Sequence, residues 1–151
     1  MPSSDLSDAE LLRYSRQIML PQFDVGGQDR LLEASVLIVG VGGLGSPVSM
    51  YLAAAGVGKL ILTDPDVVDM TNLQRQIVHS TDTVGMLKVK SAAQRLAQLN
   101  PEVEVVCLPE ALGADALLEA VKSVDVVVDC TDNLETRFAL NCACVKAVKP
   151  L

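Results

Sequence analysis

The sequence predicts an α/β fold, in which a Rossmann-like parallel sheet with helices on both faces is preceded by an N-terminal helical arm. Three observations lead to this prediction. Short runs of Val, Ile and Leu alternate with segments of helical periodicity. A glycine-rich loop joins the first such run to the helix that follows it. The chain has 151 residues, 50% of them hydrophobic, which suits a single domain rich in core-forming residues.

The helical arm is predicted over residues 1–34. Ser7-Asp-Ala-Glu10 is a capping-box pattern that opens a helix with apolar residues near one side. A second short helix is expected at about 28–34, after a pair of glycines. Neither helix resembles the core of an α/β sheet, so we divide the chain into this arm and an α/β domain at 35–151.

Four strands and four helices are expected to alternate along that domain. The expected strands are 36–39, 60–63, 103–107 and 124–129, and the expected helices are 46–55, 86–99, 114–122 and 133–148. Ser46 and Pro47 should cap and begin the first helix. The strand at 124–129 is apolar enough to be buried on both faces. Residues 147–151 resemble the start of a fifth strand, so the domain is expected to be truncated at its C-terminus.

The composition argues against nucleic-acid and membrane partners. The formal net charge is −7 and the sequence pI is about 4.6, with no basic stripe along the chain. The N-terminus has no secretory pattern, and every apolar run is shorter than a membrane span. We therefore expect a cytoplasmic protein.

The cysteine pattern does not predict a metal site. Cys107, Cys130, Cys142 and Cys144 lack the paired spacing of zinc ligands. In a cytoplasmic protein they are expected to be reduced, and to pack as small hydrophobic side chains. No zinc is expected in this chain.

A phosphate-binding loop is predicted between the first strand and the first helix. Gly40, Gly42, Gly43 and Gly45 match the pattern G-x-G-x-x-G, which lets the backbone approach a phosphate at a helix N-terminus. Asp64 ends the second strand, where a carboxylate can accept hydrogen bonds from ribose hydroxyls. These features predict nucleotide binding, and they are shared by proteins that bind NAD, FAD and ATP.

Three further charged residues follow strands or begin a helix at the same predicted edge of the sheet. Arg75 and Lys88 could stabilise a triphosphate, and Asp132 could hold Mg²⁺ together with its phosphates. Taken singly, each has a simpler interpretation: a loop charge, a helix-surface charge and a helix N-cap. Their convergence is the argument for phosphoryl-group chemistry, because a dinucleotide-binding domain does not need all three.

Four motifs in order resemble the MoeB/ThiF/HesA family, the bacterial relatives of ubiquitin-activating enzymes. They are Arg13-Tyr-Ser-Arg16-Gln-Ile, the glycine loop, Asn72-Leu-Gln-Arg75-Gln and Asp129-Cys-Thr-Asp132-Asn. The resemblance extends from about Leu6 to Leu151. It implies adenylylation of the C-terminal glycine of a small ubiquitin-like sulfur-carrier protein with a Gly-Gly end, of the molybdopterin or thiamine pathway type. The cofactors would be ATP and Mg²⁺, pyrophosphate would be released, and the enzyme would be a homodimer.

The resemblance also implies roles for individual residues. Asp64 resembles the ribose-binding acid of the family, and Asn72 lies in its nucleotide-binding motif. Arg75 and Lys88 resemble its phosphate-binding cations. Asp132 resembles its metal-associated acid, and Arg16 resembles an arginine that the family delivers to the ATP of the partner subunit.

The residue inventory agrees with this chemistry. A carboxylate nucleophile is already ionised at neutral pH, so the reaction needs positioning and charge neutralisation rather than a general base. The only histidine, His79, is therefore interpreted as structural or as a surface residue. Full-length family members continue beyond this point with a carrier-protein groove and zinc-binding cysteine pairs, so no thioester chemistry is expected here. Two alternatives stay open: an NAD-dependent oxidoreductase domain, and a non-catalytic nucleotide-binding fragment.

Overall fold

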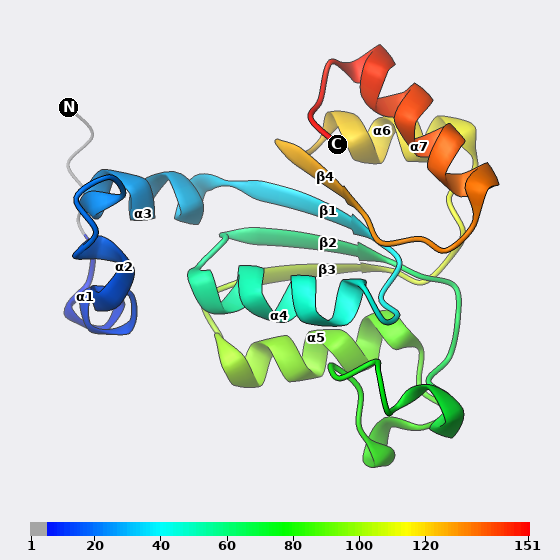
Figure 1. Cartoon of the computed structure of the whole chain (residues 1–151), viewed down its shortest axis with the longest axis horizontal. Helices are drawn as coiled ribbons and strands as arrows, with labels where there is room; N and C mark the ends of the chain where they lie inside the picture. The colour runs from blue at the N-terminus through cyan, green and yellow to red at the C-terminus, as the bar shows by residue number, and fades with distance from the viewer. Residues whose placement is uncertain (1–5) are drawn as a thin grey trace.

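A four-stranded parallel sheet forms the centre of the molecule. The computed structural model of the chain describes residues 6–151. The strand order is β3-β2-β1-β4, and β1 pairs in parallel with both β2 and β4 (Figure 1). The strands are β1 Ser35–Val39, β2 Lys59–Thr63, β3 Glu104–Leu108 and β4 Val126–Asp129. The expected α/β architecture is therefore confirmed.

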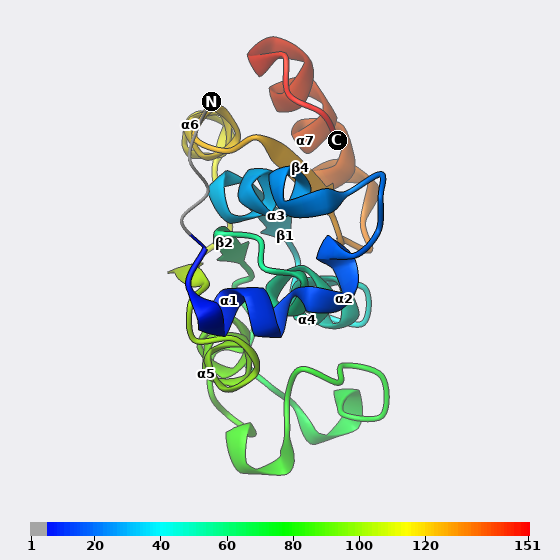
Figure 2. The ribbon, with the colours of Figure 1, turned by 90° about the vertical axis from the view of Figure 1, so that its left-hand side faces the viewer.

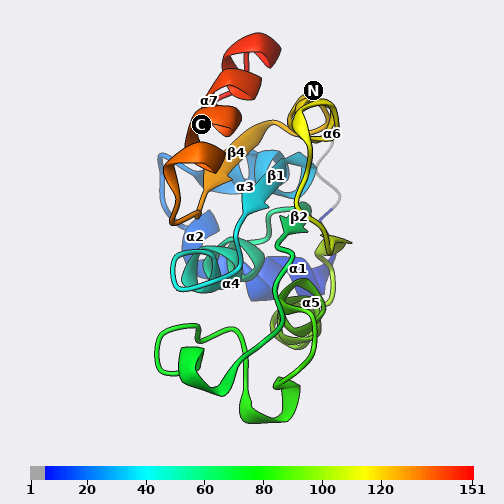
Figure 3. The same ribbon diagram turned by 90° about the vertical axis from the view of Figure 1, so that its right-hand side faces the viewer.

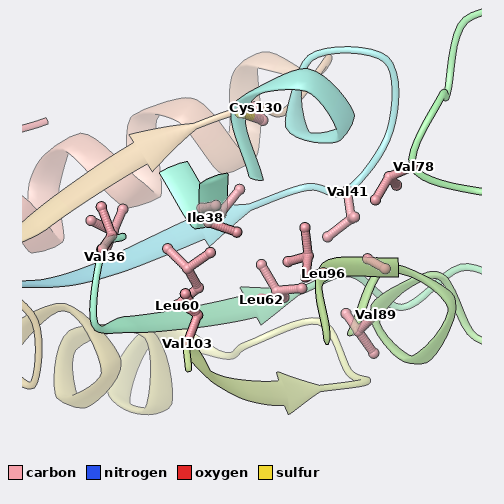
Figure 4. Packing of buried hydrophobic residues seen from close by; sticks show 13 residues of the cluster. Val36, Ile38, Val41, Leu60, Leu62, Val78, Val89, Leu96, Val103 and Cys130 are labelled. Carbon is pink, nitrogen blue, oxygen red and sulfur yellow. The ribbon is translucent and has the colours of Figure 1, made fainter. Parts of the chain in front are cut away.

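Helices cover both faces of this sheet, as expected. They are α4 Gly45–Ala55, α5 Lys88–Leu99, α6 Ala114–Lys122 and α7 Leu134–Ala147. Helices α4 and α5 lie on one face, and α6 and α7 lie on the other (Figure 1). Alternate residues of β1 enter the two cores: Ile38 packs with Leu60 and Leu62 in one (Figure 4), whereas Leu37 packs in the other. Burial of this apolar surface is the main stabilising contribution to the fold.

The N-terminal helices pack more closely on the domain than the sequence predicted. Helices α1 Asp8–Arg13, α2 Ser15–Ile18 and α3 Asp24–Glu33 lie at the amino edge of the sheet (Figure 2). Tyr14, between α1 and α2, is only 1% exposed, and its hydroxyl accepts a 2.8 Å hydrogen bond from Asn100 Nδ2. Asn100 also donates to Ala53 O, which joins the arm to the ends of α4 and α5. The interpretation that this segment contributes no core is wrong for Tyr14.

The capping box at Ser7 and Glu10 is present in α1, whereas the cap expected for α4 is not. Helix α4 begins at Gly45, so Ser46 lies inside its first turn, where its hydroxyl is buried without a hydrogen-bond partner. Pro47 does lie in that first turn. The amide of Ser46 donates to Gly42 O, which shows that the helical hydrogen bonds begin in the glycine loop itself.

The edge of the sheet at β4 also differs from expectation. Val126 is exposed, so β4 is not buried on both faces. The strand is shorter than predicted because Asp125 binds Ser35 with its main chain and its carboxylate instead of extending the ladder. Val127 N donates to Pro150 O at 3.0 Å, but residues 148–151 form no strand.

A long crossover joins β2 to α5 at the carboxyl edge of the sheet. It contains two short 3₁₀ helices, Met70–Asn72 and Thr81–Thr83, and extends away from the strands (Figure 3). Val67 and Leu87 form an antiparallel bridge that closes its base. Within residues 6–151, we find no helix long and apolar enough to cross a membrane.

Candidate functional site

A polar groove opens where the strands end at their carboxyl edge. Its cavity volume is about 770 Å³. The glycine loop, the end of β2, the crossover, the start of α5 and the loop after β4 all contribute to its walls. This is the edge at which open parallel sheets bind their ligands. The predicted site residues that line the groove are Gly40, Gly42, Gly43, Asp64, Arg75, Lys88 and Asp132.

Two glycines of the loop are required by its own backbone. Gly40 has φ +93°, and a Cβ at this position would lie 2.7 Å from the carbonyl oxygen of Cys130. A Cβ on Gly45 would lie 1.9 Å from the carbonyl oxygen of Gly40. Any side chain at either position would therefore displace the loop or the strand beside it.

The other two glycines are not required by the free chain. A Cβ on Gly42 or on Gly43 would meet only side chains of Gln76 or Arg75, at 3.4 Å and 3.7 Å. The absence of a side chain keeps this part of the loop open to the groove. This arrangement is what close approach of a phosphate to the backbone requires.

Asp64 binds the glycine loop directly. It is 6% exposed, and its Oδ2 accepts a 2.8 Å hydrogen bond from Val41 N. Its Oδ1 accepts a 2.9 Å hydrogen bond from Asp66 N. Each carboxylate oxygen can accept a second hydrogen bond, so ribose hydroxyls remain possible partners.

His79 supports the loop from behind. Its Nε2 lies 2.9 Å from the carbonyl oxygen of Val41, and its Nδ1 lies 2.9 Å from Ser91 Oγ. Because a carbonyl only accepts, Nε2 carries a proton. Burial lowers the pKa of His79, and Lys88 adds to this effect, while the hydrogen bond to Val41 and the charge of Asp64 oppose it. The structural interpretation of His79 is therefore supported: it is buried and holds the main chain of the loop.

Lys88 presents a nearly buried ammonium group to the groove. Its side chain is 7% exposed, and Nζ lies 2.9 Å from Asp66 Oδ2, whose side chain is 66% exposed. The amide of Lys88 also donates to Asp66 O. Asp66 could not be predicted as the partner of Lys88, because it is one of several acidic residues in a loop and lies 22 residues from Lys88 along the chain.

Arg75 is held by its own segment. Its Nη2 donates to Asn72 Oδ1 at 3.0 Å, and its Nη1 donates to Gln74 Oε1 at 3.1 Å. Asn72 is outside the residues that line the groove. In the free chain, Asn72 therefore orients Arg75 and does not itself reach the cavity.

The loop after β4 is fixed on both sides of Asp132. Asp129 Oδ1 accepts hydrogen bonds from the amide and hydroxyl of Thr131, and Arg137 Nη2 donates to Thr131 O at 2.6 Å. Asn133 caps α7 by accepting from Thr136 N. Asp132 is exposed at the groove between these anchored residues.

Three of the four cysteines have thiols whose environment opposes ionisation. Cys130 lines the groove, but burial, with a contribution from Asp129, raises the pKa of its thiol to about 11. Burial also raises the pKa of Cys107 and of Cys144. In the part of the chain that the structure describes, no three His, Cys, Asp or Glu side chains gather as a metal site. A single carboxylate such as Asp132 fits Mg²⁺ that is held mainly by nucleotide phosphates.

Comparison with known proteins identifies the family. The model of the ThiF family matches residues 14–151. The chain belongs to the ThiF family. This confirms the MoeB/ThiF/HesA resemblance, and superposition on solved structures agrees with the Rossmann-like fold described above.

The most similar curated relatives include three adenylyltransferases. Mouse (Mus musculus) adenylyltransferase and sulfurtransferase MOCS3 is 53% identical over 99% of this chain and 33% of its own length. The sulfur carrier protein ThiS adenylyltransferase of Escherichia coli K12 is 48% identical over 97% of this chain and 58% of its own. The molybdopterin-synthase adenylyltransferase of Salmonella typhimurium is 48% identical over 98% of this chain and 59% of its own length. The chain thus spans between about a third and three fifths of these proteins.

Solved structures match the same region. The E. coli tRNA N6-threonylcarbamoyladenosine dehydratase TcdA, in complex with ATP, superimposes with a TM-score of 0.87 and 31% identity. The match covers 96% of this chain and 59% of that one. ATP therefore binds to a protein that shares this fold at appreciable sequence identity.

One predicted site residue lies far from the groove. Arg16 is exposed on α2 at the amino edge of the sheet, opposite the glycine loop (Figure 1). Asn72 and Gly45 support the groove without lining it. The groove also contains residues that we did not predict as site residues, among them Asp66 and Gln76. Gln76 is the last residue of the motif Asn72-Leu-Gln-Arg75-Gln, and this position is the only feature of the sequence that points to it.

Proposed function

We propose that this chain is the nucleotide-binding part of an ATP-dependent adenylyltransferase. Its acceptor would be the C-terminal glycine of a small ubiquitin-like sulfur-carrier protein with a Gly-Gly end. The observation that carries the proposal is the convergence of Arg75, Lys88 and Asp132 on a groove bounded by the glycine loop, in a chain similar to adenylyltransferases over nearly its whole length.

The residues suit an in-line displacement at the α-phosphorus. An oxygen of the glycine carboxylate forms the new bond to phosphorus, the bond to the β-phosphate oxygen breaks, and pyrophosphate leaves. Arg75 and Lys88 would neutralise the phosphate charge, and the amides near Gly42 would bind phosphate oxygens. Asp132 would hold Mg²⁺, which supplies further charge neutralisation between the phosphates. Asp64 would bind the ribose.

Partners and location follow from the same proposal. A homodimer would allow Arg16 of one subunit to reach the ATP of the other, which agrees with its exposure and its distance from the groove of its own chain. We propose a cytoplasmic protein in the molybdopterin or thiamine branch of sulfur transfer. No zinc is proposed for these residues, because the four cysteines lack paired spacing.

Nucleotide titration of this chain tests the proposal most directly. Isothermal titration with ATP plus Mg²⁺, and separately with NAD, should give binding to ATP only, and ATP should raise the unfolding temperature. NAD binding without ATP binding would favour the oxidoreductase alternative, against which the family assignment already argues.

Pyrophosphate release distinguishes an enzyme from a binding fragment. A carrier protein ending in Gly-Gly should stimulate release, and the same carrier without its last glycine should not. The decisive test uses a protein that contains this chain and has the length of its curated relatives. If that protein bound ATP but released no pyrophosphate, adenylylation would be contradicted and the non-catalytic alternative supported.

A further inference from the structure

The carbonyl group of Val41, inside the glycine loop, is held by a side chain and not by the main chain. Val41 is fully buried, and within residues 6–151 no main-chain amide donates to its oxygen. The donor is His79 Nε2, at 2.9 Å. By contrast, the next carbonyl of the loop, that of Gly42, accepts from the amide of Ser46 in α4. The orientation of one peptide group in the loop therefore depends on a residue of the crossover.

The same peptide group carries the amide of Gly42. The described peptide bonds are trans, and in a planar trans peptide the carbonyl and N–H bonds point in opposite directions. Gly42 lines the groove, whereas His79 lies behind the loop and outside the residues of the groove wall. A hydrogen bond that holds Val41 O toward His79 therefore directs the N–H of Gly42 toward the groove. Among the residues that the structure describes, this amide donates no hydrogen bond.

The imidazole ring of His79 is itself fixed in place. The residue is 7% exposed, and its Nδ1 lies 2.9 Å from Ser91 Oγ, which lies 2.8 Å from Thr83 Oγ1. The preceding residue, Val78, belongs to the same core cluster as Val41 (Figure 4). A donor bound to a peptide carbonyl also polarises the peptide group, which strengthens its N–H as a donor to a further acceptor.

We propose that His79 is a positioning residue of the nucleotide site, which holds the Val41–Gly42 peptide group so that the Gly42 amide donates to a phosphate oxygen. This inference rests on the proposed function of the groove. His79 acts through Val41 and does not touch the nucleotide. Its contribution concerns the phosphate chain only, so its loss should weaken binding of ATP and leave binding of adenosine, which has no phosphate, nearly unchanged.

Two substitutions at His79 test this assignment by isothermal titration, at a temperature where each variant is folded. His79→Leu removes the donor, so affinity for ATP plus Mg²⁺ should fall by about tenfold, as expected when a hydrogen bond to a charged group is lost. Affinity for adenosine should stay within about twofold. His79→Gln keeps an N–H donor of similar reach, so it should restore ATP affinity to within about threefold of the unsubstituted chain.

A destabilising control separates positioning from stability. His79→Leu should unfold at a lower temperature, because Val41 O loses its partner. Val121→Ala should also lower the unfolding temperature, because Val121 is fully buried in the core on the other face of the sheet. That control should keep its affinity for both ATP and adenosine. Should His79→Leu not fold, His79→Asn replaces it, because its shorter side chain gives up the donor at Val41 and keeps a polar group for Ser91.

The outcomes separate this inference from the function on which it rests. If the unsubstituted chain binds no ATP, the proposed function fails and the inference fails with it. If the unsubstituted chain binds ATP, and His79→Leu retains full affinity or loses affinity for ATP and adenosine equally, His79 only supports the fold and this inference alone is overturned. Failure of His79→Gln to restore ATP affinity would overturn it as well, because the donor would then not be the property that matters.

Discussion

Replacement of Lys88 by methionine should separate nucleotide binding from folding. Methionine has nearly the length of the lysine side chain and no charge, so it can occupy the same buried position. In the free chain, Lys88 makes one ion pair, with the largely exposed Asp66. Ion pairs with an exposed partner contribute about 0–1 kcal/mol to stability. Loss of the pair is partly offset by burial of an apolar side chain, so stability should change by about 1 kcal/mol at most.

The effect on ATP should be much larger. A charge-assisted hydrogen bond from the ammonium to a phosphate oxygen is worth about 1.5–3 kcal/mol, which corresponds to a loss of about 10- to 150-fold in affinity. Isothermal titration with ATP plus Mg²⁺ measures that loss. Thermal unfolding without ligand should show a shift of about 4 °C or less, given about 2–4 °C per kcal/mol for a chain of this size.

Lys90→Met is the matched control, because Lys90 lies on the same helix but is exposed and outside the groove. It should leave both quantities unchanged. A role of Lys88 in nucleotide binding is contradicted if Lys88→Met binds ATP within about threefold of the unsubstituted chain. A loss of about 3 kcal/mol or more of stability in the free variant would contradict this role equally, because Lys88 would then stabilise the fold.

Two further predictions concern the glycine loop. Gly45→Ala should destabilise the free chain by about 1–3 kcal/mol, because its Cβ would meet Gly40 O at 1.9 Å; urea unfolding measures this loss. Gly43→Ala should keep the stability of the free chain and weaken ATP binding, which titration with ATP measures. His79 has a folded pKa below its ordinary value of about 6.5, so the unfolded state binds its proton more readily and stability should fall as pH decreases from about 7 to 5. In His79→Gln this decrease should be smaller, and an equal decrease in both proteins would contradict the assignment.

The order of strands and helices was predictable from the sequence because it depends on local patterns. Runs such as Val36–Val39 form strands, and the four helices expected in the α/β domain appear within two residues of their predicted bounds. The helix expected at about 28–34 begins four residues earlier, at Asp24, and contains the two glycines that were expected to precede it. The errors arise from distant contacts. Helix α5 starts later than predicted because Met86 and Leu87 bind the base of the crossover, through Val68 and Val67. The start of β4 is lost because Asp125 binds Ser35, which is 90 residues away.

The candidate site was predictable to the extent that its residues lie in motifs. The glycine loop, Arg75, Lys88 and Asp132 do line one groove. The partners that hold them were not predictable, because they follow from the fold. Arg137 binds Thr131 O across the first turn of α7, and Asp66 reaches Lys88 across the crossover. Neither residue has a pattern of its own in the sequence.

Residues at the carboxyl edge of the sheet fall into two groups. Substitutions in only one of these groups can test function without a loss of stability. Gly40, Gly45 and His79 already have a task in the free chain, where they form or hold the loop. Asp64 belongs with them, because both of its oxygens accept main-chain hydrogen bonds. Its replacement by alanine would remove the partner of two main-chain amides, of which that of Val41 is buried, so a loss of activity in that variant would say little about ribose binding.

The second group has no comparable task in the free chain. Gly42 and Gly43 leave space that a methyl group could occupy, and Gln76 has a buried oxygen without a partner. These three residues do not stabilise the free protein, and they lie together along the groove. An anionic ligand at the main chain of Gly42 and Gly43 explains the two glycines, whereas the unpaired oxygen of Gln76 is an acceptor and requires a hydrogen-bond donor. Substitutions in this group should change nucleotide affinity with little loss of stability, which is the pattern expected of a binding site.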